Sequence, residues 1–384
     1  MITNRGLFHA TMARENDDQL LYIEQGFWDG LYEDWLAEGL PTGVNPPSFA
    51  GIGERPSLFD HFNTAKWVYC LFNQFYYPEP PEETLEIRDG RRIYRDRMHN
   101  TLAVRADGGA SLPQQLDFAI KSQEDYLAVR DRLTGNASQR IHLDQFPPEA
   151  QMPLLGATAR SQNDHLVSLW VHGPFAFLRD LLGVEMAIVV PYLDPKWARM
   201  LLDDHLDACR EVAALIIPKL QPDLCYVWED NAGKTGPMVS PKLFREFHLP
   251  WYQAWRDFLR EMGVRWMVVD TDGDPRALVP LWIEGGMDCM LPWEVNSVDI
   301  LKIAEAYPDL ALCGGICKHV FEQEGLAPID AEVERVVKPL RARGRYFPSL
   351  DHWVPRGVPL AKFTYFHQRL LGHGKANRVT WPSG

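Results

Sequence analysis

Residues 224–274 read LCYVWEDNAGKTGPMVSPKLFREFHLPWYQAWRDFLREMGVRWMVVDTDGD. Two short apolar runs, Leu224–Trp228 and Arg265–Asp270, enclose a long segment whose apolar residues recur at helical spacing, which predicts a strand, a helix and a second strand. We expect the helix over Pro241–Met262, after Ser240, with a kink at Pro250. Each apolar run leads into acidic residues, so the carboxyl ends of these strands are expected to be polar.

The same alternation continues from about residue 165 towards the C-terminus, and it predicts parallel strands joined by crossover helices. A long helix over Lys196–Ile217 is expected after Asp194-Pro195, a good cap followed by proline. The pattern fits either a barrel or an open doubly wound sheet. No glycine-rich phosphate-binding turn follows an early strand, and polar clusters follow several strands, so we predict a (β/α)8 TIM barrel. The predicted strands are Leu166–Val171, Leu224–Trp228, Arg265–Asp270, Cys289–Leu291, Ala311–Cys313 and Arg345–Phe347.

The main part of the barrel is expected in residues 151–384. Residues 1–150 are expected to form an N-terminal α+β extension that packs on the barrel and can include its first elements. Within the extension, Asp89-Gly90 predicts a hairpin turn in Leu85–Arg97, and Ser122–Leu133 has the pattern of a helix. Trp28 and Trp35 can wall a flat or aromatic ligand, although packing in the core explains them equally well.

The composition is that of an ordinary globular protein, with 46% hydrophobic and 24% charged residues in a chain of 384. A formal net charge of -13 argues against nucleic-acid binding, which needs clustered Lys and Arg. No apolar run approaches the ~20 residues of a membrane span, and the N-terminus lacks the apolar core of a secretory signal, so we expect a cytoplasmic protein. The six cysteines do not indicate a disulfide framework, and most are expected to be buried thiols.

Two acidic pairs follow predicted strands. Asp270 and Asp272 are two residues apart, so they can point to the same side and share one small volume. Two carboxylates placed that close either share a proton or bind a cation. Glu229 and Asp230 follow the preceding strand and are candidates for substrate binding, although Lys234 can also pair with one of them.

A third cluster follows the last predicted strand, where Asp351 and His352 combine a carboxylate with an imidazole suited to acid–base chemistry or metal ligation. His172 and Lys318 lie near the same rim and are candidates for substrate binding. Asp274, before a proline, is interpreted as a helix cap. Other residues with a structural rather than a functional interpretation are His205 and His248, both within predicted helices.

These residues occur in segments that resemble the uroporphyrinogen decarboxylase superfamily, which includes methylcobamide and coenzyme M methyltransferases. The segments are Glu229-Asp-Asn-Ala-Gly-Lys-Thr-Gly-Pro-Met-Val-Ser-Pro, Phe244-Arg-Glu-Phe-His-Leu-Pro-Trp-Tyr, Asp270-Thr-Asp-Gly-Asp, Gly314-Gly-Ile-Cys-Lys and Asp351-His-Trp-Val-Pro. The resemblance covers most of the chain. It implies a TIM barrel with a cleft at the carboxyl ends of the strands.

The sequence departs from both branches of that superfamily. The arginine-containing N-terminal segment by which the decarboxylases hold the acidic side chains of a porphyrinogen is missing; the corresponding region reads Gln25-Gly-Phe-Trp-Asp-Gly. The methyltransferases resembled here hold zinc with a His-x-Cys motif and a later cysteine. Those positions fall on Asp270-Thr-Asp and near Asp351-His352. A site of Asp270, Asp272 and His352 would suit zinc bound by oxygen and nitrogen, or another divalent metal.

The resemblance favours a corrinoid-dependent methyltransferase or demethylase that acts on a small methylated substrate and uses a corrinoid carried by a separate protein. In this hypothesis Asp270, Asp272, Asp351 and His352 perform the chemistry, and a homodimer is one possible state of the chain. One alternative is a metal-independent decarboxylase of a porphyrinogen-like or other carboxylated substrate, which needs no cofactor. A second alternative is a non-catalytic barrel that binds a corrinoid or tetrapyrrole.

Overall fold

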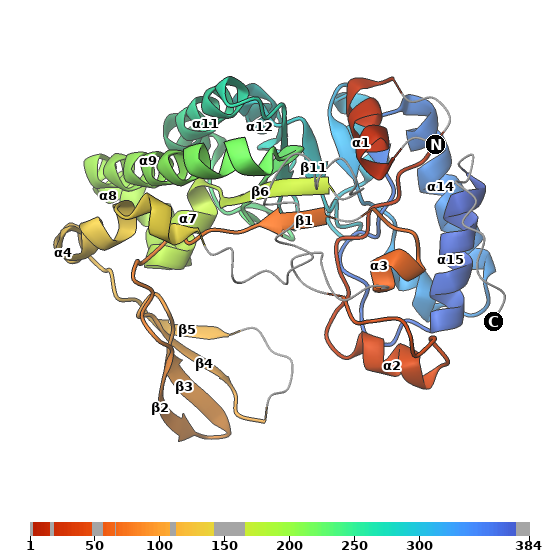
Figure 1. Cartoon of the computed structure of the whole chain (residues 1–384), viewed down its shortest axis with the longest axis horizontal. Helices are drawn as coiled ribbons and strands as arrows, with labels where there is room; N and C mark the ends of the chain where they lie inside the picture. Colours follow the sequence, from red (N-terminus) through yellow and green to blue (C-terminus); the bar gives the residue numbers. More distant parts are fainter. Residues whose placement is uncertain are drawn as a thin grey trace.

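The computed structural model describes residues 3–15, 19–47, 57–65, 67–107, 113–141 and 166–373. Its centre is a parallel sheet in the order β1-β6-β7-β10-β11-β12-β13 (Figure 1). Each strand therefore pairs with the next strand of the same sheet along the chain, as in a TIM barrel, and the six predicted strands are all present. The strands are β1 (Trp67–Cys70), β6 (Leu166–His172), β7 (Leu224–Trp228), β10 (Trp266–Asp270), β11 (Cys289–Leu291), β12 (Ala311–Cys313) and β13 (Tyr346–Phe347).

The gap between the first and last strands is filled by an extended segment, residues 19–27, which we call the seam segment. No ladder joins β13 to β1 within the described residues. Instead, the amide of Ile23 donates to the carbonyl of Pro348, directly after β13, over 3.1 Å. On the other side, the amide of Ala65, just before β1, donates to the carbonyl of Tyr22 over 2.7 Å. The seam segment thus takes the position of an eighth strand without forming a regular ladder.

The interior of the barrel is a small apolar cluster of side chains from alternate strand positions, as the period of two requires. Helix α1 (Asn4–Ala13) adds Leu7, Phe8 and Met12 to this cluster. The same helix contacts the amino ends of two strands, because His9 lies 2.9 Å from Asp223, before β7, and accepts a hydrogen bond from Trp266. Helix α1 therefore covers the amino end of the barrel and leaves the carboxyl end open.

Helices follow the strands and cover the outside of the barrel (Figure 1). The expected helix at Lys196–Ile217 is α9, and its cap is confirmed because Asp194 accepts a hydrogen bond from the amide of Trp197. The helices are α7 (Pro174–Leu182), α8 (Val184–Leu193), α9 (Pro195–Leu220), α10 (Pro241–Leu243), α11 (Leu249–Glu261), α12 (Val279–Gly285), α13 (Ile300–Ala306), α14 (Ala327–Arg343) and α15 (Leu360–Gly372), with a 3-10 turn η4 (Lys318–Glu322).

The helix expected over Pro241–Met262 has its irregularity before Pro250 rather than at it. A π-helical turn, η3 (Phe244–His248), joins α10 to α11, and Pro250 is the second residue of α11. Proline lacks an amide hydrogen, so a locally widened turn just before it removes the clash with the preceding carbonyls.

The N-terminal part adds an antiparallel sheet that projects away from the barrel (Figure 1). The predicted hairpin is confirmed: Asp89 and Gly90, both at positive φ, form the turn between the first two strands of this antiparallel sheet. The predicted helix after Ser122 is α4 (Gln123–Thr134). The remaining elements are β2 (Glu83–Arg88), β3 (Arg91–Arg95), β4 (Thr101–Arg105), β5 (Gln114–Asp117), β8 (Ala232–Gly233), β9 (Gly236–Pro237), α2 (Leu31–Ala37), α3 (Leu58–His61) and η1 (Ala137–Arg140).

Two further expectations concern the whole chain. All six cysteines are free thiols, and all but the half-buried Cys317 are buried. Among the helices in the described ranges, none combines the length and the apolar character that crossing a bilayer requires.

Candidate active site

The carboxyl ends of three adjacent strands lie level with one another. His172 of β6 is the register partner of Trp228 of β7, and Trp228 is the partner of Asp270 of β10. Trp266 and Val268 belong to the interior of the barrel, so the alternation along β10 places Asp270 on the same side, one step nearer the open end. The fold thus brings this carboxyl group to the mouth of the barrel.

A cavity of about 550 Å³ lies at this mouth. A volume of this size suits a small molecule, which makes the cavity the candidate active site. Among the described residues, neither a lysine nor an arginine lines it. Its polar lining consists of Gln25, Asp230, Asp270, Asp272 and His352, and its aromatic lining consists of Trp28, Tyr69, Trp170, Tyr226, Trp228 and Trp353.

The charged lining residues were predicted from the sequence, but most of the aromatic ones were not. Tyr69, Trp170 and Trp228 stand near the carboxyl ends of their strands and contact the interior cluster. Their position in the two-residue period of each strand could have identified them. Of the two tryptophans considered as a ligand wall, Trp28 lines the cavity, whereas Trp35 is fully buried and donates to the carbonyl of Val358.

Three carboxyl groups form the acidic part of the cavity. Asp230, Asp270 and Asp272 each offer an oxygen atom, and these atoms lie within 4.8 Å of one another. Burial raises the pKa of Asp270 well above its usual range, and the charges of the other two raise it further. Burial also raises the pKa of Asp230 to about 6, with Asp272 adding to the shift and Arg179 opposing it. Tyr226 donates its hydroxyl to Asp270 over 2.6 Å, which fixes this side chain.

His352 completes the polar part of the cavity. Its Nε2 atom lies 3.6 Å from Oδ2 of Asp272. Burial lowers the pKa of His352, but the nearby carboxylate of Asp272 outweighs this effect, so the net shift is upward. The imidazole is stacked on Trp28, with ring centroids 5.8 Å apart and an angle of 9° between the rings. His352 is therefore held between a carboxylate and an aromatic wall.

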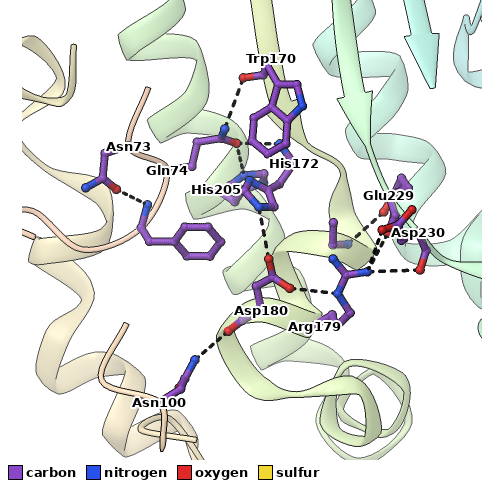
Figure 2. Close-up of polar contacts among 12 residues, drawn as sticks. Asn73, Gln74, Asn100, Trp170, His172, Arg179, Asp180, His205, Glu229 and Asp230 are labelled. Carbon is purple, nitrogen blue, oxygen red and sulfur yellow. Dashed lines mark hydrogen bonds and ion pairs between the residues drawn. The ribbon is translucent and has the colours of Figure 1, made fainter. Parts of the chain in front are cut away.

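A chain of charged groups beneath the cavity positions its walls (Figure 2). Arg179 of helix α7 pairs with Asp180 over 2.9 Å and donates to the main-chain carbonyls of Glu229 and Asp230. Its guanidinium also lies over the ring of Trp228, 4.5 Å from the centroid. Although burial alone would raise the pKa of Asp180, His172 and Arg179 hold it below its usual range. Arg179 thus fixes both an acid and an aromatic ring of the cavity.

Glu229 lies outside the cavity in this network. Its carboxyl group is fully buried, accepts from the hydroxyl of Tyr252 and accepts from the amide of Ala176 over 3.0 Å. Burial raises the pKa of Glu229 to about 7, against the opposing effect of these hydrogen bonds. A Cβ atom at Gly173 would lie 2.4 Å from the Glu229 Cδ atom, so this close approach requires glycine.

The other predicted site residues are likewise outside the cavity. Asp351 is buried and accepts hydrogen bonds from the amides of Val295 and Lys318. The Lys318 ammonium lies 3.4 Å from the same carboxylate, so these two candidates pair with each other and fix loops at the rim. His172 packs its ring against Trp170 and Trp228 and lies 3.3 Å from Asp180, which places it directly behind the aromatic wall.

The donor atoms of the cavity suit a hard cation rather than a thiolate-bound zinc ion. The clustered donors are carboxylate oxygens, which hard divalent metals prefer. Cys313 lies in the barrel interior, where burial raises the pKa of its thiol well above the usual range. Cys317 is half-buried, and burial raises the pKa of its thiol too. Neither cysteine lines the cavity, so the residues present do not form the zinc site implied by the methyltransferase resemblance.

Residues 156–370 match the family model described as uroporphyrinogen decarboxylase (URO-D). The chain belongs to the URO-D family. This match includes β6 to β13 and contains every charged residue of the cavity, and the family membership expected from the sequence motifs is confirmed. No curated protein sequence matches this URO-D-family chain.

A solved structure described as a methyltransferase from Methanosarcina mazei is similar over 97% of this chain and 98% of its own, with a TM-score of 0.61 at 14% identity. At this identity the similarity concerns the fold, and it agrees with the TIM-barrel assignment. A B12-independent methionine synthase from Shewanella sp. W3-18-1, in complex with selenomethionine, covers 94% of this chain and 95% of its own, with a TM-score of 0.39 at 10% identity.

Proposed function

We propose that this URO-D-family chain is a methyltransferase that demethylates a small substrate and transfers the methyl group to a corrinoid on a separate protein. The observation that carries the proposal is the composition of the cavity, which combines three carboxyl groups with six aromatic rings at the catalytic end of a TIM barrel. Carboxyl groups in such a site favour a donor with positive charge on the atom that bears the departing methyl group, and this charge makes that atom a better leaving group.

Decarboxylation of a porphyrinogen fits this cavity poorly. Such a substrate carries several carboxylates and needs cationic side chains to hold them. The described lining instead offers Asp230, Asp270 and Asp272, with His352 as its one basic side chain. Like charges would repel the substrate and lower its affinity.

Methyl transfer needs orientation and charge stabilisation from these residues. A reduced corrinoid on the partner protein would supply the nucleophile for the methyl group. The bond from the methyl carbon to its heteroatom breaks, and the electron pair of that bond stays on the heteroatom. The rings of Trp170 and Trp228 line the cavity, while the carboxyl group of Asp270 is held by Tyr226 at the carboxyl end of β10. The metal was expected from the sequence at Asp270, Asp272 and His352. It would instead be held by Asp230, Asp270 and Asp272, whose clustered oxygen donors fit a hard divalent ion.

The test is an anaerobic assay with cob(I)alamin and a panel of methylated amines, sulfides and phenyl methyl ethers. Methyl transfer is measured from the change in absorbance of the corrinoid. We expect at least one donor to methylate the corrinoid, and we expect Asp270→Asn with Asp272→Asn to reduce the rate by roughly 100-fold. Asp274→Asn is the matched control, because Asp274 pairs with Arg276 outside the cavity. Release of carbon dioxide from a carboxylated substrate without methyl transfer would instead support a decarboxylase.

The metal is tested separately by elemental analysis of the protein after loading with Mn²⁺, Mg²⁺ or Zn²⁺. About one ion per chain that disappears in the Asp270→Asn, Asp272→Asn variant is expected if the cluster of three carboxylates binds a metal. Binding of a corrinoid or tetrapyrrole without turnover of any donor would favour a non-catalytic barrel.

A further inference from the structure

The charge of the cavity is not balanced by its own lining. Three carboxyl groups face one imidazole, and Arg179 approaches Asp230 only from behind the wall, at 3.9 Å. Carboxylates brought together in a partly buried site either hold a proton or attract a positive charge, because their mutual repulsion is otherwise uncompensated. The described residues of the lining therefore favour a cationic occupant over a neutral or anionic one.

Aromatic rings make up most of the remaining lining, and this distinguishes between kinds of cation. A metal ion needs oxygen or nitrogen ligands and gains little from the faces of tryptophan. A methylated ammonium or sulfonium ion has no N–H or S–H group to donate, and its charge is spread over methyl groups that pack well against aromatic faces. The lining by Trp28, Trp170, Trp228 and Trp353 is the chemistry that recognises such an ion.

The walls are held in place by contacts among the rings and beneath them. Trp170 and Trp228 are stacked with centroids 5.8 Å apart, and His172 packs edge-on against both. Trp28 packs against His352 and Trp353 on the other side. Rings that are already fixed lose little side-chain freedom when a ligand enters, so the cavity is preorganised for a ligand of matching shape.

We infer that the cavity binds a small organic cation with methyl groups on a quaternary nitrogen or tertiary sulfur, held by the tryptophan rings and attracted by Asp230, Asp270 and Asp272. The binding of such a cation does not depend on methyl transfer. Only the reaction of the bound cation rests on the proposed function. When the methyl carbon moves to the acceptor, the bond to nitrogen or sulfur breaks and the electron pair stays on that atom. The product is a neutral amine or sulfide, which departs without needing a proton. A sulfide product stays neutral and loses its attraction to the carboxylates, which favours its release.

The test is a binding measurement that does not depend on turnover. Choline and its neutral isostere 3,3-dimethylbutanol, in which carbon replaces the charged nitrogen, are titrated against the full chain by calorimetry or by tryptophan fluorescence. We expect choline to bind at least tenfold more tightly than the isostere. Trp28→Leu and Asp272→Asn should each weaken choline binding at least tenfold, whereas Asp274→Asn should not change it.

Trp28 is chosen because 42% of its surface is exposed, so its replacement should leave the fold intact. Equal affinity for choline and the isostere, or binding of neither, would overturn the inference. Methyl transfer from a neutral ether or thiol without choline binding would refute the inference while supporting the proposed function. Choline binding without methyl transfer to any corrinoid would support the inference and contradict the proposed function.

Discussion

Glu24 of the seam segment gives a prediction that tests how the barrel is closed. Only 1% of this residue is exposed, and its carboxyl group accepts hydrogen bonds from Tyr22 and from Ser349, the latter over 3.2 Å. Burial nevertheless raises the pKa of Glu24 from 4.5 to about 7, because the hydrogen bonds only partly offset it. The folded chain therefore keeps a proton on Glu24 that the unfolded chain releases.

The sign of the effect follows from this order of pKa values. As the pH rises from about 4.5 to 7, the unfolded state loses the Glu24 proton first, so the free energy of unfolding falls. At 1.36 kcal/mol for each pH unit, the whole contribution is about 3 kcal/mol. Glu24→Gln cannot ionise, so this variant should lack that decline. Relative to the wild type, it should become more stable as the pH rises, with most of the change complete by pH 8.

The assay is urea unfolding of the wild type and Glu24→Gln at several values between pH 5 and pH 8. Glu305→Gln on the exposed surface of α13 is the control, and its stability relative to the wild type should not change with pH in this way. Comparing each variant with the wild type at the same pH cancels the titration of every other group. A stability difference between wild type and Glu24→Gln that stays constant across the series would refute the reasoning.

Three further changes should have measurable effects on stability. Arg179→Met should lower the free energy of unfolding by roughly 2 kcal/mol, because Asp180 keeps only His172 as a charged partner. Asp180→Asn added to it should recover part of the loss in a double-mutant cycle followed by urea unfolding. Trp35→Ala should cost about 3–5 kcal/mol in thermal unfolding, whereas Trp28→Ala should cost less than about 1 kcal/mol, because the first is fully buried and the second is 42% exposed. Gly173→Ala should cost about 1–3 kcal/mol in the same measurement, because its new methyl group would meet the Glu229 carboxyl group; a loss near zero would mean that this carboxyl group moves freely.

Much of the barrel could be predicted from sequence because its strands are buried on both faces. Such strands appear as short apolar runs, and the helices between them have their own period and caps, as at Asp194. Strand β1 was missed since Trp67–Cys70 stands outside the regular alternation that begins near residue 165. The seam segment was missed because it forms no regular ladder, so neither its length nor its pattern is that of a strand.

The acids of the cavity could be predicted because parallel strands place their carboxyl ends together. Their partners could not, since those come from elsewhere in the chain. Asp230 is approached by Arg179 from helix α7 rather than by Lys234, and Glu229 is bound by Tyr252 from α11. The pairing of Asp351 with Lys318 outside the cavity could not be predicted either, because the two residues are far apart in the sequence.

The seam segment also bears on how the chain reaches its folded state. Glu24 and Ser349, which meet there, are 325 positions apart, so this contact forms only after nearly the whole polypeptide has been made. Until then the seam segment, already bonded to the residue before β1 through Tyr22 and Ala65, is an open edge that can pair with other chains. Because Gln25 and Trp28 come from one side of this closure and His352 and Trp353 from the other, the ligand cavity is assembled late. Slow synthesis or a high concentration of unfinished chains should therefore favour aggregation over a competent cavity.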